Sequence, residues 1–203
     1  MTQIALPLTH SGPREPASIV LGEGNFRVAE ALGASHDWPF GTAILAGPPR
    51  SGKSLFAGWF ASHTRGGAID NADTREETEI FHAWNRAQED GYPLLLTVSS
   101  EGWEIDLPDL RSRMGAALQL EIGPPDDEMA AELMLSHAAQ RGLALGEGAA
   151  AYLVPRMERS HAAIERIVAE IDRLSLERKL PATMSIWRDA LDAVQGPEQA
   201  RLL

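Results

Sequence analysis

Eight residues in the first third of the chain carry the clearest chemical signal, because they match the pattern G-x-x-x-x-G-K-[ST] in full. They read GPPRSGKS and are Gly47, Pro48, Pro49, Arg50, Ser51, Gly52, Lys53 and Ser54. In this pattern the glycines let backbone N–H groups curl around phosphate oxygens, the lysine reaches the outer phosphates, and the final hydroxyl ligates Mg²⁺. The pattern therefore predicts a site for a nucleoside phosphate.

A phosphate loop of this kind needs a second acid at the end of a neighbouring strand to hold the metal. Asp70, in the run AIDN, is the candidate, so we expect Ser54 and Asp70 to hold Mg²⁺. The alternative for Asp70 is a turn aspartate after a weak strand. Hydrolysing enzymes place an acid that polarises water at the next position, which here is Asn71. Because an amide cannot take up a proton, we expect slow or absent intrinsic hydrolysis.

The elements around the loop follow the order strand, loop, helix. Residues 42–46 (TAILA) form a short apolar run, which predicts the strand ahead of the loop. Behind the loop, helical spacing is seen for Leu55, Phe56, Trp59 and Phe60. This context supports the nucleotide site more than the pattern alone does.

Further strands and one further helix are expected up to residue 122. The runs 68–69, 93–99 and 117–122 predict strands, the second continuous and apolar and therefore buried on both faces. Asp73 followed by Glu76 resembles a capping box. The helix that it would open has an apolar face made of Ile80, Phe81 and Trp84.

After the stretch GPPDD at 123–127 the pattern becomes all-helical, which indicates a hinge there. Asp126 and Ser160 are plausible caps for two of the helices. Helical spacing occupies four runs, 129–141, 147–157, 161–177 and 185–194. We expect an N-terminal peptide and linker, an α/β nucleotide-binding part and a helical part, over residues 1–17, 18–123 and 124–203.

Composition and charge restrict the function further. The chain has 203 residues and no cysteine, so it can form no disulfide and no thiolate metal site. No segment approaches the roughly 20 apolar residues of a membrane span, so we expect a soluble chain, and the lack of cysteine favours the reducing cytoplasm as its compartment. With 29 acidic and 18 scattered basic residues the net charge is −11, which argues against a DNA-binding surface and favours a protein partner.

The chain opens with an apolar hexapeptide, QIALPL at residues 3–8, followed by a Pro-, Gly- and Ser-rich stretch to residue 16. It has no basic flank and no long apolar stretch, so it is not expected to be a signal peptide. The linker behind it favours a tethered docking peptide over the alternative, an N-terminal edge strand.

Together these features resemble the Hda family, the AAA+ regulators related to the replication initiator DnaA. The stretches that carry the resemblance are QIALPL, the loop at 47–54, IDNAD at 69–73, LLLTVSS at 94–100 and LPDLRSRM at 107–114. It implies a P-loop AAA+ core that holds ADP or ATP with Mg²⁺, followed by a helical lid. It also implies no DNA-binding domain of its own, so that DNA is not bound sequence-specifically.

The function implied by the resemblance is negative regulation of chromosomal replication initiation. Such a protein binds the DNA-loaded sliding clamp, the β subunit of DNA polymerase III, and stimulates hydrolysis of ATP bound to DnaA. It would be cytoplasmic and reach the nucleoid through the clamp. The family's head-to-tail pairing also allows a homodimer.

Site residues follow from the resemblance position by position. Arg113 would be the arginine finger that acts in trans, with Arg111 the weaker candidate; the alternative is a solvent-facing arginine on a short helix. Val20 and Leu21 would flank the adenine base. The clamp-binding residues would be Gln3, Ile4, Leu6, Pro7 and Leu8, in which glutamine offers a donor and an acceptor and the leucines are apolar anchors.

Two departures from the family pattern alter these expectations. The interval between Lys53 and Asp70 is too short for the usual extra strand and helix, so we expect a reduced parallel sheet of about four strands. The lid arginine that contacts phosphates, sensor 2, falls on Ala162, where Arg159 or Arg166 could substitute. The polar residue at a strand end, sensor 1, falls near Thr97 or Ser99.

Two other functions remain open from the residues alone. A self-contained P-loop NTPase, such as a small-molecule kinase, would need a lid with clustered arginines and a catalytic acid, and neither is evident. An adaptor that binds the clamp without nucleotide chemistry is the second, and the intact Lys53 and Ser54 speak against it.

Overall fold

The computed structural model describes residues 19–100 and 102–196, which divide into two compact units after Gly123. The predicted clamp-binding peptide lies outside the described residues. Within the described ranges, no helix combines the length and the apolar character needed to cross a bilayer.

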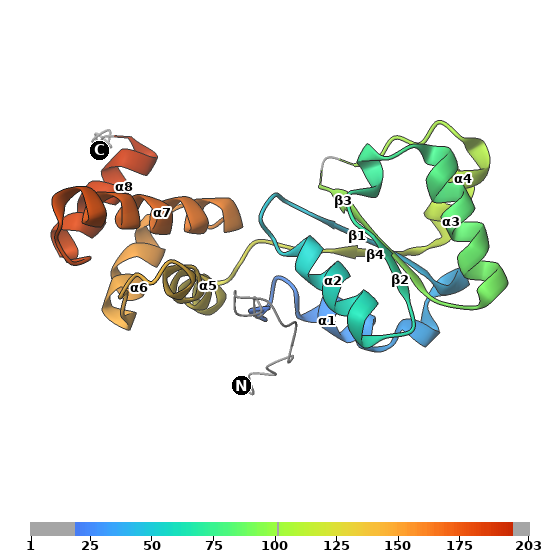
Figure 1. Cartoon of the computed structure of the whole chain (residues 1–203), viewed down its shortest axis with the longest axis horizontal. Coiled ribbons are helices and arrows are strands. Elements are labelled where there is room, and N and C mark those ends of the chain that lie inside the picture. The colour runs from blue at the N-terminus through green and yellow to red at the C-terminus, as the bar shows by residue number, and fades with distance from the viewer. Residues whose placement is uncertain (1–18, 101, 197–203) are drawn as a thin grey trace, which may run out of the picture. The chain divides into compact units, whose positions relative to one another are not determined.

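The first unit is built on a parallel sheet of four strands in the order β2-β3-β1-β4 (Figure 1). The strands are β1 (Thr42–Gly47), β2 (Gly67–Ile69), β3 (Leu94–Ser99) and β4 (Leu118–Glu121). A single helix, α2 (Lys53–His63), connects β1 to β2. The predicted reduced sheet of four strands is therefore confirmed in the part of the chain that the structure describes.

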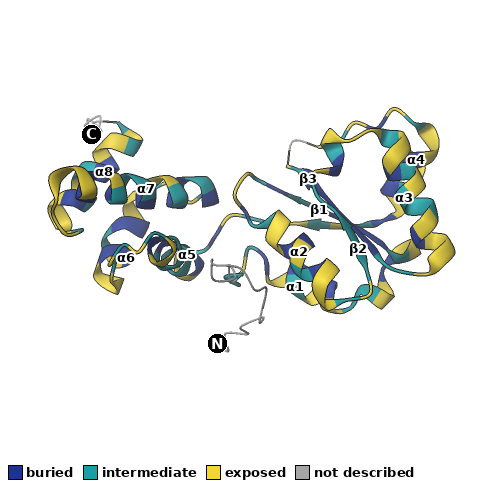
Figure 2. Cartoon of the chain, in the orientation of Figure 1, coloured by how far each residue is buried: buried dark blue, intermediate teal, exposed yellow. Residues whose placement is uncertain are grey.

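Helices cover both faces of this sheet. Alternate residues of β1 point to opposite faces, so Leu45 packs with α1 (Phe26–Gly33) and α2, whereas Ile44 packs with α3 (Glu77–Asp90) and α4 (Pro108–Ala116). The buried residues accordingly belong to two clusters, one on each side of the sheet. Figure 2 colours buried residues dark blue along the strands and the helices that cover them. The architecture leaves the carboxyl ends of the parallel strands open for a site.

Two expectations about local structure in this unit were wrong or incomplete. The helix α3 begins at Glu77 with Glu76 as its N-cap, and residues 72–74 form a short 3₁₀ turn. Asp73 does not cap α3, because its carboxylate accepts a hydrogen bond from the backbone N–H of Ser99 at 2.8 Å. The sequence pattern also left α1 unpredicted.

The second unit contains the four expected helices. They are α5 (Asp127–Gln140), α6 (Glu147–Leu153), α7 (His161–Arg178) and α8 (Met184–Gln195). Asp126 caps α5 by accepting from Met129 N, and Ser160 caps α7 by accepting from Ala163 N. The helix expected over 147–157 ends early as a 3₁₀ turn that contains Pro155, which has no N–H to donate.

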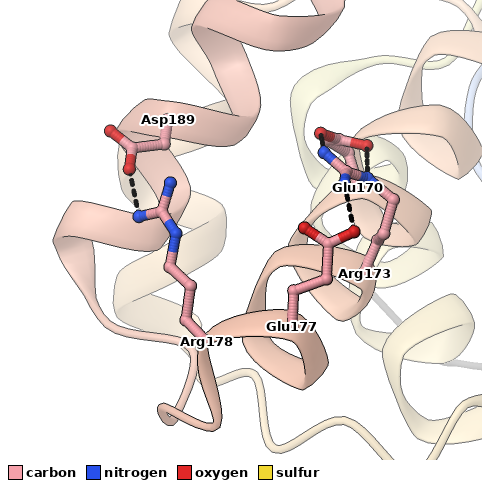
Figure 3. Close-up of polar contacts among 5 residues, drawn as sticks. All are labelled: Glu170, Arg173, Glu177, Arg178 and Asp189. Carbon is pink, nitrogen blue, oxygen red and sulfur yellow. Dashed lines mark hydrogen bonds and ion pairs between the residues drawn. The ribbon is translucent and has the colours of Figure 1, made fainter.

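Ion pairs on the solvent face of α7 add to the packing of this unit (Figure 3). Arg173 pairs with Glu170 and with Glu177, each at 2.5 Å, and Arg178 pairs with Asp189 of α8. The hydrogen bond from Arg173 lowers the pKa of Glu170 below its usual value of 4.5. A lowered carboxyl pKa stabilises the folded state above pH 4.5, and this contribution is lost as the pH falls through the folded-state pKa.

Replacing Arg173 with methionine keeps the apolar stem of the side chain and removes the donor. We expect the pKa of Glu170 to rise toward its ordinary value and the stability of the variant to depend less on pH below about 4.5. An NMR titration of the Glu170 carboxyl carbon measures this, with Arg178→Met as the control because its partner is Asp189. An unaltered Glu170 titration in Arg173→Met would contradict the assignment.

Candidate functional site at the carboxyl end of the sheet

The loop between β1 and α2 depends on its two glycines. A Cβ added at Gly47 would lie 2.9 Å from Ser51 Oγ and 3.1 Å from Ile122 Cβ, which leaves no room for a side chain. Gly52 has φ 91°, in the left-handed region that favours glycine, and is the N-cap of α2. Arg50 also lies in this region, with φ 66°, so the loop carries some backbone strain. The loop thus curves tightly into the start of the helix.

Lys53, the first residue of α2, folds back onto the loop. Its Nζ donates to the carbonyl oxygens of Gly47 at 2.6 Å and Pro48 at 3.0 Å. Burial lowers the pKa of Lys53 below 10.5, and the carboxylates of Asp70 and Asp73 oppose this shift. An ammonium group that is partly desolvated in this way is suited to an anionic partner.

Ser54, Asp70 and Thr97 converge from three different elements. Ser54 Oγ donates to Asp70 Oδ2 at 2.7 Å, and Thr97 Oγ1 donates to Asp70 Oδ1 at 2.5 Å. Thr97 is fully buried in β3 and also accepts from the backbone N–H of Asn71 at 2.9 Å. Both carboxylate oxygens of Asp70 are therefore oriented by hydroxyl groups, and the structure brings the predicted Ser54–Asp70 pair together.

The turn after Asp70 has its own anchors. Asn71 adopts a left-handed conformation with φ 52°, and Arg75 Nε donates to the carbonyl oxygen of Asp70 at 3.1 Å. The side chain of Asn71 is exposed, and its amide lies 3.4 Å from Asp70 Oδ2. The neighbour of Asp70 is thus an amide donor rather than a base.

The donor set of the loop fits a nucleoside phosphate with Mg²⁺. Ser51 Oγ is buried and has no hydrogen-bond partner among the described residues, so it is available to a ligand oxygen. Lys53 supplies a positive charge at the start of α2, where the helix dipole also favours an anion. Ser54 and Asp70 supply the hard oxygen ligands that Mg²⁺ prefers.

Arg113 lies on α4 and is held by α3. Its guanidinium carbon is 4.3 Å from the ring centroid of Phe81 and 4.2 Å from that of Trp84, and Nη1 donates to Asn85 Oδ1 at 2.6 Å. The residue is half-buried, whereas Arg111 is exposed and donates to the carbonyl oxygen of Ile105. Arg113 is therefore a positioned guanidinium and not an unrestrained surface arginine.

Phe81 and Trp84 were expected on the apolar face of their helix, together with Ile80. Only Ile80 is fully buried, while the two aromatic rings are half-buried and flank Arg113. Sequence reasoning missed this role and that of Asn85. The signal that could have found these roles is the i, i+3, i+4 spacing of Phe81, Trp84 and Asn85, which places the three side chains on one face of the helix.

The remaining predicted nucleotide residues lie in two places. Val20 and Leu21 form a half-buried segment ahead of α1, where the buried Asn25 donates to Val20 O and accepts from the N–H of Gly22. In the helical unit, Arg166 is exposed and lines a cavity of about 330 Å³ beside Glu158.

The other lid residue proposed as a substitute, Arg159, is already paired. It contacts Asp127 at 3.0 Å, and Ala162 between the two arginines is half-buried. Of the two arginines, Arg166 has the longer ion-pair distance, 3.9 Å to Glu158, and is the more available for another partner.

Comparison with known proteins begins with the helical unit. Residues 126–191 match the family model described as "Hda, lid domain". The chain is also 27% identical over 127 residues to the chromosomal replication initiator protein DnaA of Magnetococcus marinus and 25% identical over 128 residues to that of Lactiplantibacillus plantarum. Each match covers 61% of this chain and only 28% of the relative, so the chain spans little more than a quarter of these proteins. The predicted resemblance to Hda is confirmed.

Solved structures of low sequence identity share the fold. Domain III of DnaA from Thermotoga maritima has a TM-score of 0.71 at 14% identity, over 88% of this chain and 95% of that one. The RuvB Holliday junction branch migration motor of Thermotoga maritima has a TM-score of 0.60 at 17% identity, over 85% and 70%. A replication initiator DnaA bound to AMPPCP and single-stranded DNA has a TM-score of 0.57 at 15% identity, over 79% and 66%. The predicted AAA+ fold is confirmed.

Proposed function

We propose that this chain is a DnaA-related regulator of replication initiation that stimulates hydrolysis of ATP bound to DnaA. The observation that carries the proposal is the Hda lid match over residues 126–191, in a chain whose fold is that of DnaA domain III.

The first part is an adenine nucleotide, ADP or ATP with Mg²⁺, at the loop between β1 and α2. Lys53 would bind the outer phosphates, and Ser54 with Asp70 would hold the metal. A DnaA of the same fold has been solved with AMPPCP, which supports an adenine nucleotide here. Because Asn71 follows Asp70, the bound nucleotide would turn over slowly or not at all.

The second part is Arg113 as an arginine finger that acts in trans. A guanidinium placed beside the γ-phosphate neutralises charge that develops in the transition state, and such a finger contributes about 10³ to 10⁵ in rate. Phe81, Trp84 and Asn85 hold the group in place, so less rotamer entropy is lost when it enters the neighbour's site.

The third part is the pair of partners, DnaA and the sliding clamp. A chain with net charge −11 has no favourable electrostatic route to DNA. Binding of residues 3–8 to the clamp would place Arg113 close to DnaA on DNA. Head-to-tail pairing of two copies is compatible with this arrangement.

The test is single-turnover hydrolysis of ATP bound to DnaA, with the clamp loaded on DNA and the full-length chain added. We expect hydrolysis to accelerate with added chain, and to accelerate less when the clamp is omitted. Hydrolysis at the same rate with and without the chain would refute the proposal.

The double variant Gln3→Ala, Leu6→Ala tests the docking peptide. We expect clamp affinity to fall at least about tenfold, because truncating an apolar anchor and a paired amide removes contacts of hot-spot size. Surface plasmon resonance on immobilised clamp measures it, with Thr9→Ala, His10→Ala in the adjoining linker as the matched control. Equal affinities of the two double variants would exclude residues 3–8 as the docking peptide.

A further inference from the structure

Phe40 combines two unfavourable features that the core of the first unit does not explain. Its backbone is left-handed, with φ 51° and ψ 28°, which costs a residue with a Cβ about 1–2 kcal/mol. The residue is also 62% exposed, so its ring contributes little buried apolar area to folding. A large aromatic side chain is thus presented to solvent on a strained backbone.

Hydrogen bonds hold this turn in one conformation. The carbonyl oxygen of Phe40 accepts from Gln88 Nε2 at 2.8 Å and from Thr42 Oγ1 at 3.0 Å. The next residue, Gly41, is also left-handed, and its N–H donates to Trp38 O at 2.9 Å. The backbone at Phe40 is therefore held by hydrogen bonds from α3 and from within the turn.

A chain of contacts joins this turn to Arg113. Thr42 Oγ1, which donates to Phe40, itself accepts from Trp84 Nε1 at 3.0 Å, and the Trp84 ring lies against the Arg113 guanidinium at 4.2 Å. Gln88 lies one turn beyond Trp84 on α3. One stripe of α3 thus holds Arg113 at one end and Phe40 at the other.

We infer that Phe40 is an apolar anchor of the protein–protein interface to which Arg113 also belongs. The partner that covers this surface is the DnaA molecule whose ATP Arg113 reaches, and the inference rests on the proposed function to that extent. An aromatic ring on a preorganised backbone binds with little loss of conformational entropy, which is the usual character of an interface hot spot.

Charge around Phe40 gives the chemistry of the partner's surface. Asp37 lies three residues ahead of Phe40, and Glu89 with Asp90 follows Gln88; all three carboxylate residues are exposed. These acids are near the anchor in sequence or follow its partner Gln88, and Asp37 also contacts His36 Nε2 at 3.4 Å, whereas the other end of the stripe carries the cation of Arg113. The socket that receives Phe40 is apolar with a basic rim, and the ATP phosphates of the same partner meet Arg113.

The variant Phe40→Gly separates docking from folding. Glycine is favoured at this φ, so relief of strain offsets its greater entropy in the unfolded chain, and we expect the melting temperature to stay the same or to rise. In the assay with ATP bound to DnaA, we expect the half-saturating concentration of the chain to rise at least about tenfold. The rate at saturation stays close to that of the wild type, because Arg113 is intact.

Two further variants complete the experiment. Phe40→Tyr keeps an aromatic ring and is expected to keep the wild-type half-saturating concentration. Leu176→Ala removes an apolar side chain that is 71% exposed in the helical unit and is expected to change nothing.

The assay distinguishes a failure of the proposed function from a failure of the inference about Phe40. If the wild-type chain fails to accelerate hydrolysis, the proposed function is refuted and the role of Phe40 with it. If the wild type accelerates hydrolysis and Phe40→Gly has an unchanged half-saturating concentration, only the inference about Phe40 is overturned. A rise of the same size in Leu176→Ala would also overturn it, since it would show a nonspecific apolar effect.

Discussion

Replacing Arg113 with alanine is expected to reduce the stimulated hydrolysis of DnaA-bound ATP by about 10³-fold or more at saturating concentrations of the chain. The physical reason is the loss of a guanidinium that Phe81, Trp84 and Asn85 of α3 hold in a fixed orientation on α4. The measurement is the single-turnover rate with clamp loaded on DNA. A rate within a few-fold of the wild type would remove Arg113 from the mechanism.

Arg111→Ala is the matched control for this prediction. It removes the same charge from the same helix, but its guanidinium bonds a backbone carbonyl in its own chain and lies away from the aromatic pair. We expect it to keep most of the stimulation. Arg113→Lys keeps the charge but loses the planar guanidinium that lies over the Phe81 and Trp84 rings, so we expect it to recover only part of the rate.

Loss of Arg113 also has a measurable effect on folding. Its stack on Phe81 and Trp84 is worth about 0.5–1 kcal/mol per ring at a partly exposed site. We therefore expect a modest fall in melting temperature, while nucleotide affinity at Lys53 and clamp affinity stay unchanged. This pattern separates a defect in the finger from a general loss of structure.

Replacing Lys53 with alanine is expected to weaken binding of ADP or ATP by about 10- to 150-fold. Hydrogen bonds to a charged group are worth about 1.5–3 kcal/mol, and Lys53 is the charged donor that the start of α2 offers to phosphates. Isothermal titration calorimetry with each nucleotide and Mg²⁺ measures the loss. Arg65→Ala, which removes one exposed positive charge just beyond the far end of α2, is the control.

The same variant is not expected to destabilise the nucleotide-free protein. Burial lowers the pKa of Lys53, which means that the folded state disfavours its charged form. Removing the ammonium relieves this cost and offsets the two loop hydrogen bonds that are lost. An equal affinity of Lys53→Ala and wild type for both nucleotides would show that the loop is not a phosphate site.

Local patterns were sufficient for much of the fold. The strand over 42–47 and the helix from Lys53 follow from a short apolar run and a helical spacing on either side of the loop. The four helices of the second unit follow in the same way, with Asp126 and Ser160 as their caps. These features depend on residues within a few positions of one another, so periodicity and capping rules detect them.

Local patterns failed where a distant residue competes for the same group. Asp73 has the spacing of a capping residue, but its carboxylate accepts a hydrogen bond from the backbone N–H of Ser99 on β3 instead. Trp84 packs against the core as its spacing predicts, but that spacing gave no sign that its ring also lies against Arg113 or that its N–H donates to Thr42. In each case the partner lies more than 25 positions away in sequence, where no periodicity can indicate it.

The sequence alone determined that the chain carries a phosphate-binding pattern between a strand and a helix, a four-stranded parallel sheet and a helical second part. Only the tertiary structure decided that two hydroxyls orient Asp70, that α3 fixes Arg113 and that Phe40 is held outward on a left-handed backbone. The physical reason is that short-range spacing sets secondary structure, whereas the orientation of a functional side chain depends on contacts between elements that only packing brings together.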